Sequence, residues 1–337
     1  MRPTLLADTI KARIAADVKR TIYIVGSPGL GKTQIVKQIA DDLNIGFKCI
    51  HAPLKQPEDM GLPVVSAKRD SVKFIVPAED FPMEGSACED KGILLIDELP
   101  QAENSIQKIL ANLLQEREIH GQKLKPGWTI IATGNRAKDR AGANRVLSHL
   151  MNRMTMLEFE PHLDDWCEWY MKQPNCSFEG LSFLRFRPGL LSDFNPQLDI
   201  NPTPRAWVEG VFASMGTVPV EAEMETFKGD VGEGAAAEFV GFLKIYRDLP
   251  DPDTILLNPD KAKVPTDSAT LFALSGALAQ RASEINFDRV MTYSNRMPPE
   301  FTVIVVRTAT QKDKAISNTK AFRQWALGPG AKLLGNA

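Results

Sequence analysis

Short apolar runs recur through the first half of the chain, and segments with helical spacing of apolar residues separate most of them. The runs occupy residues 21–25, 47–51, 92–97, 128–134 and 154–160. Runs of this length that alternate with helices predict a parallel sheet with crossover helices. The run "GILLID" at 92–97 is apolar without alternation, which predicts a central strand that is covered on both faces.

Two further segments interrupt this alternation and predict β-hairpins. Residues 61–77 contain two apolar runs around a charged turn, and residues 117–127 contain a smaller pair that we expect to turn at Gly121 and Gln122. Neither hairpin is needed to complete the sheet. We therefore interpret both as insertions that project from it.

After about residue 161 the strand patterns give way to helical patterns separated by Pro- and Gly-rich breaks. The predicted helices occupy residues 164–172, 203–215, 235–249, 269–282 and 298–311. Residues 301–306 could also form a strand, but Pro298 and Pro299 favour the start of a helix. The expected organisation is an α/β domain at 1–161, a smaller α-helical domain at 162–330 and a mobile tail at 331–337.

The composition excludes some classes of protein. The 337 residues carry a formal charge of -2, with a pI near 6.2, so no global basic field favours nucleic acid or an anionic membrane surface. The first 20 residues are charged throughout, unlike a signal peptide, and no 18-residue apolar stretch predicts a membrane span. The four cysteines follow no metal-site spacing, so reduced thiols in a cytoplasmic protein are the simplest interpretation.

The stretch "GSPGLGKT" at 26–33 fits the G-x-x-x-x-G-K-[ST] pattern of a phosphate-binding loop, between a predicted strand and a predicted helix. Glycines allow the backbone to approach a phosphate, and the positive end of the following helix attracts it. Lys32 is expected to reach the β and γ phosphates, and Thr33 to offer its hydroxyl to Mg²⁺. The expected nucleotide-binding residues are Gly26, Ser27, Pro28, Gly29, Leu30, Gly31, Lys32, Thr33 and Gln34.

Two further strands end in polar residues suited to nucleotide chemistry. Asp97 and Glu98 follow the apolar residues of "LLIDEL", at the end of the sheet where ligands bind in folds of this kind. Asp97 can bind Mg²⁺, and Glu98 can polarise an attacking water. Asn135 ends the run "IIATGN", where its neutral amide could orient that water or touch the γ phosphate.

Taken in order, these motifs resemble an AAA+ ATPase, closest to the MoxR-like, dynein-related group of the helix-2-insert clade. The resemblance covers about residues 20–210 through the Walker A stretch "GSPGLGKT", the Walker B stretch "LLIDEL" and Asn135 as sensor 1. It implies a P-loop NTPase fold followed by a helical lid, with ATP and Mg²⁺ as cofactors. It also identifies the two hairpins with the helix-2 insert and the pre-sensor-1 hairpin.

The resemblance assigns roles to two arginines. Arg153 falls where the family places an arginine finger that reaches the nucleotide of a neighbouring subunit, and Arg205 in "NPTPRAW" matches the sensor-2 arginine of the lid. The family often has an acidic residue and a phenylalanine around the finger, whereas Asn152 and Met154 stand here. Other arginines therefore remain candidates for the finger: Arg136, Arg140 and Arg145.

The implied function is ATP hydrolysis by a homo-oligomeric ring, most often of six subunits, that remodels a separate partner, such as a protein with a von Willebrand factor A domain.

A nucleic-acid motor or loader stays open as an alternative function, because "KRDSVK" or "RAKDR" could line a basic pore. A nucleotide switch without turnover is disfavoured by the intact Glu98. Preference for ATP over GTP is implied by the family alone.

Several aromatic and imidazole side chains are interpreted as structural. Trp166, Trp169 and Tyr170 have the i, i+3, i+4 spacing of a helix face, which favours the core of the helical domain over a platform for stacking bases. His51 and His120 have no companion carboxylate or cysteine at a motif spacing. We therefore expect no metal site at either histidine.

Overall fold

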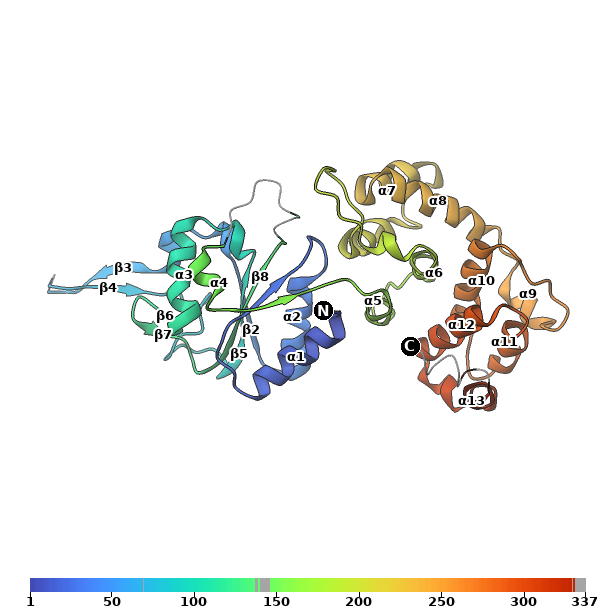
Figure 1. Cartoon of the computed structure of the whole chain (residues 1–337), viewed down its shortest axis with the longest axis horizontal. Helices are drawn as coiled ribbons and strands as arrows, with labels where there is room; N and C mark the ends of the chain where they lie inside the picture. The colour runs from blue at the N-terminus through green and yellow to red at the C-terminus, as the bar shows by residue number, and fades with distance from the viewer. Residues whose placement is uncertain (69, 137–138, 140–145, 329, 331–337) are drawn as a thin grey trace. The chain divides into compact units, whose positions relative to one another are not determined.

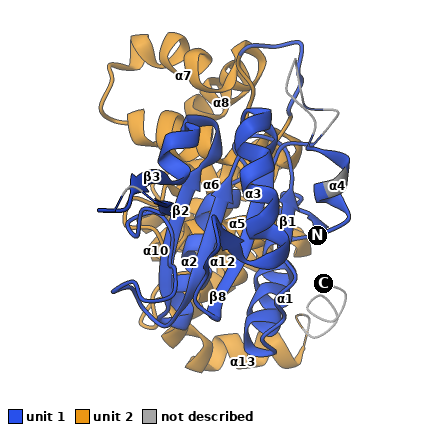
Figure 2. Ribbon diagram, turned by 90° about the vertical axis from the view of Figure 1, so that its left-hand side faces the viewer, with its two compact units in different colours: residues 1–162, 194–199 blue, residues 163–193, 200–337 orange. Residues whose placement is uncertain are grey.

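The computed structural model describes residues 1–68, 70–136, 139, 146–328 and 330 (Figure 1). The chain divides into two compact units, one of residues 1–162 with 194–199 and one of residues 163–193 with 200–337 (Figure 2). The units span nearly equal lengths of chain, so the helical unit is not the smaller one that the sequence suggests. The expected tail at 331–337 lies outside the described residues.

A five-stranded parallel sheet forms the centre of the first unit, as predicted. Its strands pair in the order β2-β5-β8-β1-β9. Their bounds are β1 Ile22–Val25, β2 Gly46–His51, β5 Lys91–Asp97, β8 Gly127–Gly134 and β9 Thr155–Glu158. Strand β5, predicted from "GILLID", pairs on both sides and is buried from Gly92 to Asp97. It is therefore an inner strand, with β8 in the middle of the sheet.

Helices cover both faces of this sheet because alternate residues of each strand point to opposite faces. Ile93 and Leu95 of β5 share a hydrophobic cluster with residues of α1 and α2, whereas Leu94 and Ile96 share another with residues of α3. Each fully buried aliphatic side chain stabilises such a core by about 1.5–3 kcal/mol. The helices of this unit are α1 Pro3–Ala15, α2 Lys32–Leu43, α3 Asn104–Glu116 and α4 Ser148–Met151.

Both predicted hairpins are present. The longer pairs β3 (Leu62–Val65) with β4 (Val72–Ile75) and extends away from the sheet (Figure 1), and the shorter pairs β6 (Glu118–Ile119) with β7 (Gln122–Lys123). The shorter hairpin turns at His120 and Gly121, one residue earlier than predicted. Both residues have positive φ, 49° and 78°, as a two-residue turn of the I′ type requires.

The second unit is helical, as predicted. Residues 301–306 belong to α12, so the prolines before them start a helix. Its α-helices are α5 Leu163–Tyr170, α6 Phe178–Phe186, α7 Glu223–Val231, α8 Glu233–Arg247, α9 Pro252–Leu257, α10 Ser268–Arg281, α11 Phe287–Ser294, α12 Pro299–Lys312 and α13 Lys320–Leu327. A π-helical segment, Ala206–Phe212, follows Arg205. Among the described helices, none is both long enough and apolar enough to cross a membrane.

The aromatic residues of α5 belong to the core of this unit, as interpreted from sequence. Trp166 and Tyr170 are buried and stack with their ring centroids 4.9 Å apart. Trp169 is partly buried against the same cluster. Their π faces are therefore used in packing.

Candidate nucleotide site

The loop between β1 and α2 has the backbone that its glycines predict. Gly29 and Gly31 adopt positive φ, 72° and 84°, which side chains other than glycine rarely allow. A Cβ on Gly26 would lie 2.8 Å from the carbonyl oxygen of Phe159, so a side chain there would displace the loop. Helix α2 begins at Lys32, and its positive end can therefore face an anion held by the loop.

The ammonium group of Lys32 lies inside this loop. Its Nζ donates to the carbonyl oxygens of Gly26 and Ser27, both at 2.9 Å, and to Oδ1 of Asn135 at 3.0 Å. Lys32 is 9% exposed, so these hydrogen bonds satisfy a largely buried charge. The structure thus brings together two residues that the sequence separates by most of the sheet unit.

Asp97 is joined to the same loop through Thr33. The Thr33 hydroxyl donates to Asp97 Oδ2 at 2.9 Å, and the Thr133 hydroxyl donates to Asp97 Oδ1. Thr133 also accepts from the backbone N–H of Glu98 at 3.0 Å, a role that the sequence pattern does not indicate. The hydroxyl of Thr33 and the carboxylate of Asp97 are hard oxygen donors, which fit Mg²⁺.

Glu98 has a strained backbone and an exposed side chain. Its φ of 56° and ψ of 37° are left-handed, a conformation that costs a non-glycine residue about 1–3 kcal/mol and often marks functional sites. Its carboxylate makes no hydrogen bond or ion pair with any residue that the structure describes. It is therefore open to solvent next to Asp97.

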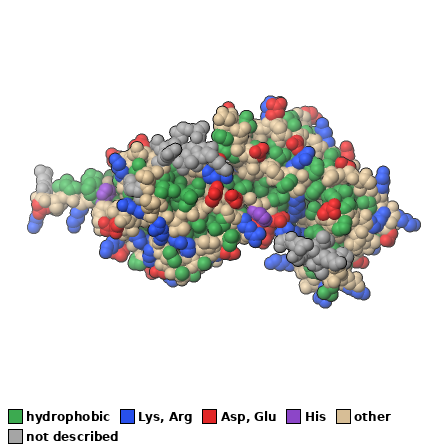
Figure 3. Space-filling model, viewed as in Figure 1, with side chains coloured by type: hydrophobic (Ala, Val, Ile, Leu, Met, Phe, Trp, Pro, Cys, Tyr) green, Lys and Arg blue, Asp and Glu red, His purple; other side chains and the backbone are tan. Residues whose placement is uncertain are grey.

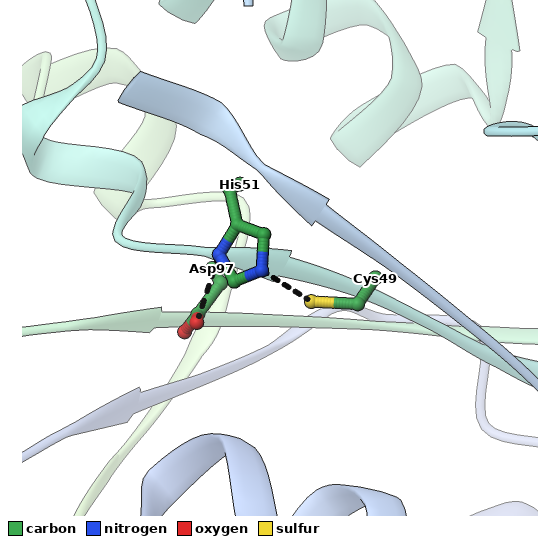
Figure 4. A group of neighbouring side chains, drawn as sticks. All are labelled: Cys49, His51 and Asp97. Carbon is green, nitrogen blue, oxygen red and sulfur yellow. Dashed lines mark hydrogen bonds and ion pairs between the residues drawn. The ribbon is translucent and has the colours of Figure 1, made fainter. Parts of the chain in front are cut away.

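His51 and Cys49 lie beside Asp97, so His51 has spatial companions that its spacing in the sequence does not indicate (Figure 4). His51 Nδ1 is 3.4 Å from Asp97 Oδ2, and His51 Nε2 is 3.9 Å from Cys49 Sγ. The parallel pairing of β2 with β5 sets His51 opposite Asp97 in register. Burial, and then the charge of Asp97, raises the pKa of the Cys49 thiol to about 12.

The candidate finger arginines differ in their surroundings. Arg136 is held by contacts within the chain, because its guanidinium donates to the Ser27 hydroxyl and, at 2.7 Å, to Asp139 Oδ2. The Ser27 hydroxyl in turn donates to Asp139 Oδ2 at 2.8 Å, so Ser27, Arg136 and Asp139 form one hydrogen-bonded group. Arg153 follows α4 and is half-buried. Its guanidinium makes no hydrogen bond or ion pair with the residues that the structure describes. Arg140 and Arg145 lie outside the described residues.

Arg205 belongs to the helical unit. Its side chain is exposed at the start of a helix, directly before the π-helical segment. Segments of π-helix are rare and are frequent at functional sites. This setting is compatible with the sensor-2 role that the resemblance implies.

Comparison with known proteins agrees with this geometry. The model of the ATPase family associated with various cellular activities (AAA) matches residues 22–159, which contain the loop, Asp97, Glu98, Asn135 and Arg153. None of the curated proteins with which the chain was compared matches it.

Two solved structures match the chain at low similarity. A protein of Cytophaga hutchinsonii, provisionally described as an ATPase, is 16% identical with a TM-score of 0.34, over 91% of this chain and 80% of that one. A lysine-to-arginine variant of Thermotoga maritima RuvB is 17% identical with a TM-score of 0.37, over 82% and 79%.

The family match and the geometry agree on the same residues. The parallel sheet, its flanking helices and the helical C-terminal region form the fold of an AAA+ P-loop NTPase. Residues 22–159 are therefore the part of the chain that is similar to the AAA ATPase family.

Proposed function

We propose that this protein is an Mg²⁺-dependent, ATP-hydrolysing AAA+ ring motor of MoxR type that remodels or activates a partner protein in the cytoplasm. The observation that carries the proposal is the pair of hydrogen bonds from Lys32 to Asn135 and from Thr33 to Asp97. They join Walker A, Walker B and sensor 1 at one edge of the sheet. Exposed Glu98 lies next to Asp97 there.

The chain's own groups account for binding and hydrolysis. Lys32 would exchange the carbonyls of Gly26 and Ser27 for phosphate oxygens, which are stronger acceptors for an ammonium group. Thr33 and Asp97 would hold Mg²⁺, which neutralises phosphate charge when bound. Glu98 would orient a water for in-line attack on the γ phosphate, and Asn135 would hold that water or a γ oxygen.

Completion of the site requires a neighbouring subunit if Arg153 acts in trans. Arg153 is half-buried, and its guanidinium makes no hydrogen bond or ion pair with the residues that the structure describes. Arg136 instead bonds to Ser27 and Asp139, so Arg153 is the better candidate for the finger. A finger of this kind stabilises charge in the transition state and is worth about 10³–10⁵ in rate. Arg205 would take the sensor-2 role that the resemblance implies. The assembly we propose is a homo-oligomeric ring, with six subunits as the first expectation.

The β3–β4 hairpin supports a protein as the partner. It exposes six large apolar side chains, which Figure 3 shows gathered along its length: Leu62, Val64, Val65, Val72, Phe74 and Ile75. Among the described residues of the hairpin, the positively charged side chains are Lys68 and Lys73. Nucleic-acid sites are much more positively charged than protein interfaces, so this surface fits a protein, such as one with a von Willebrand factor A domain.

The test is steady-state ATP hydrolysis with and without Mg²⁺ for wild type, Glu98→Gln and the control Glu103→Gln. We expect Glu98→Gln to bind ATP but to lose turnover, and Glu103→Gln, on an exposed carboxylate before α3, to keep it. Equal turnover by Glu98→Gln and wild type would contradict the proposal. Stimulation of turnover by single-stranded or double-stranded DNA would favour a nucleic-acid motor instead.

A further inference from the structure

Cys49, His51 and Asp97 offer three different metal-binding groups at one point of the sheet edge (Figure 4). Cys49 and His51 are two residues apart on β2, so both side chains point to the same face. Asp97 lies opposite His51 on the neighbouring strand β5. Strand pairing thus fixes the positions of all three groups.

We propose that these residues form a binding site for a borderline or soft divalent cation of the Zn²⁺ type. One ligand atom from each residue lies within 4.8 Å of the others. Tetrahedral Zn²⁺ holds sulfur at about 2.3 Å and nitrogen or oxygen at about 2.0–2.2 Å, which places its ligand atoms roughly 3.4–3.8 Å apart. His51 Nδ1 lies 3.4 Å from Asp97 Oδ2, and His51 Nε2 lies 3.9 Å from Cys49 Sγ. Because one ion binds only one of these nitrogens, the three ligand atoms would draw together around it from separations of up to 4.8 Å.

The chemistry of the donors separates this site from the Mg²⁺ site. Mg²⁺ prefers oxygen ligands, whereas a thiolate and an imidazole select Zn²⁺ and related ions. His51 is exposed, which gives a cation an entry path from solvent, and Asp97 is largely buried. Three protein ligands leave the fourth tetrahedral position for water.

Asp97 belongs to both sites, so zinc bound there would also affect the proposed ATP hydrolysis. Because the same carboxylate accepts from Thr33, a zinc ion on Asp97 would compete with Mg²⁺ and its nucleotide. This consequence rests on the proposed function. The binding of zinc to nucleotide-free protein does not.

The experiment titrates Co²⁺, a spectroscopic substitute for Zn²⁺, into the nucleotide-free full-length protein, followed by displacement with Zn²⁺. We expect one equivalent to produce a thiolate-to-cobalt charge-transfer band and the intense visible bands of tetrahedral cobalt. Cys49→Ser should abolish the charge-transfer band, and His51→Ala should weaken affinity by at least about tenfold, since each removes a ligand. Cys88→Ser, on a half-buried cysteine elsewhere in the same unit, is the matched control.

Two results would overturn the proposal. One is the absence of a thiolate band in the wild type, and the other is a band that persists in Cys49→Ser but is lost in Cys88→Ser. Thermal unfolding of each variant without metal separates loss of a ligand from loss of the fold. ATP hydrolysis is not measured in this experiment. The result for zinc binding can therefore be interpreted even if the protein proves not to hydrolyse ATP.

Discussion

The hydroxyl of Thr33 lies 2.9 Å from Oδ2 of Asp97 and donates a hydrogen bond to it. This bond connects the first residues of α2 to the end of β5, two elements that the sequence separates by the whole first hairpin. The other oxygen of the same carboxylate is held by Thr133. Asp97 is therefore positioned from both sides by hydroxyl groups.

Thr133→Val should impair both stability and turnover. The substitution removes the partner of a buried carboxylate oxygen and of the Glu98 N–H, and an unsatisfied buried polar group costs about 1–3 kcal/mol. Urea unfolding measures the stability, and steady-state hydrolysis measures the turnover. Thr129→Val, half-buried on the same strand, is the control and should change neither by a comparable amount.

Lys32→Ala should weaken ATP binding by about 10- to 100-fold, because hydrogen bonds to charged groups contribute about 1.5–3 kcal/mol each. Binding of a fluorescent ATP analogue, measured by anisotropy, checks this. The control Lys37→Ala changes an exposed lysine of the same helix and should leave the affinity unchanged. Equal affinity in Lys32→Ala and wild type would mean that the loop does not bind the phosphates.

His120→Ala should loosen the long hairpin. The His120 ring stacks on Phe74 with centroids 4.4 Å apart, and Gln122 donates to the Phe74 carbonyl at 2.6 Å, so the short hairpin supports the long one. Loss of a stacked pair worth about 0.5–1.5 kcal/mol should raise trypsin cleavage at Lys68 and Lys73 by roughly 2- to 12-fold. Mass spectrometry of limited digests measures the rate, and unchanged cleavage would show that the hairpin is rigid without this contact.

Zinc at low concentration should inhibit hydrolysis, and Cys49→Ser should relieve the inhibition. The expected inhibition is competitive with Mg–ATP, because both cations need the Asp97 carboxylate. Initial rates at several Mg–ATP concentrations, with zinc set by a metal buffer, check this. Inhibition of equal strength in Cys49→Ser would place the inhibitory ion elsewhere.

The sequence predicts most of the fold because its signals are local. The five strands follow from short apolar runs, and the positive φ of Gly31 follows from a motif that requires glycine at that position. The proximity of His51 to Asp97 is not predictable in this way, since it depends on which strands become neighbours. Periodicity within a run identifies a strand but not its partner.

Two local details also escaped prediction for physical reasons. The left-handed backbone of Glu98 contradicts the preference of a β-strand end for extended residues, and only the packed site holds it. The short hairpin turns at His120 because Gly121 takes the second position of the turn, whereas the pattern suggested that Gly121 takes the first. One glycine is compatible with either position in the turn, so the sequence pattern does not decide between the two pairings of the strands.

The most direct test of a shared catalytic site mixes two inactive variants, Glu98→Gln and Arg153→Ala. Each alone should assemble with ATP, shown by mass measurement, and hydrolyse ATP at a rate reduced by about 10³ or more. In an equal mixture, about a quarter of the interfaces combine an intact Glu98 with an intact Arg153 from the neighbour, so activity should return to roughly that fraction of wild type. Recovery to this level supports the trans-acting ring, whereas a mixture as inactive as its components, or an Arg153→Ala protein that hydrolyses ATP at the wild-type rate, contradicts it.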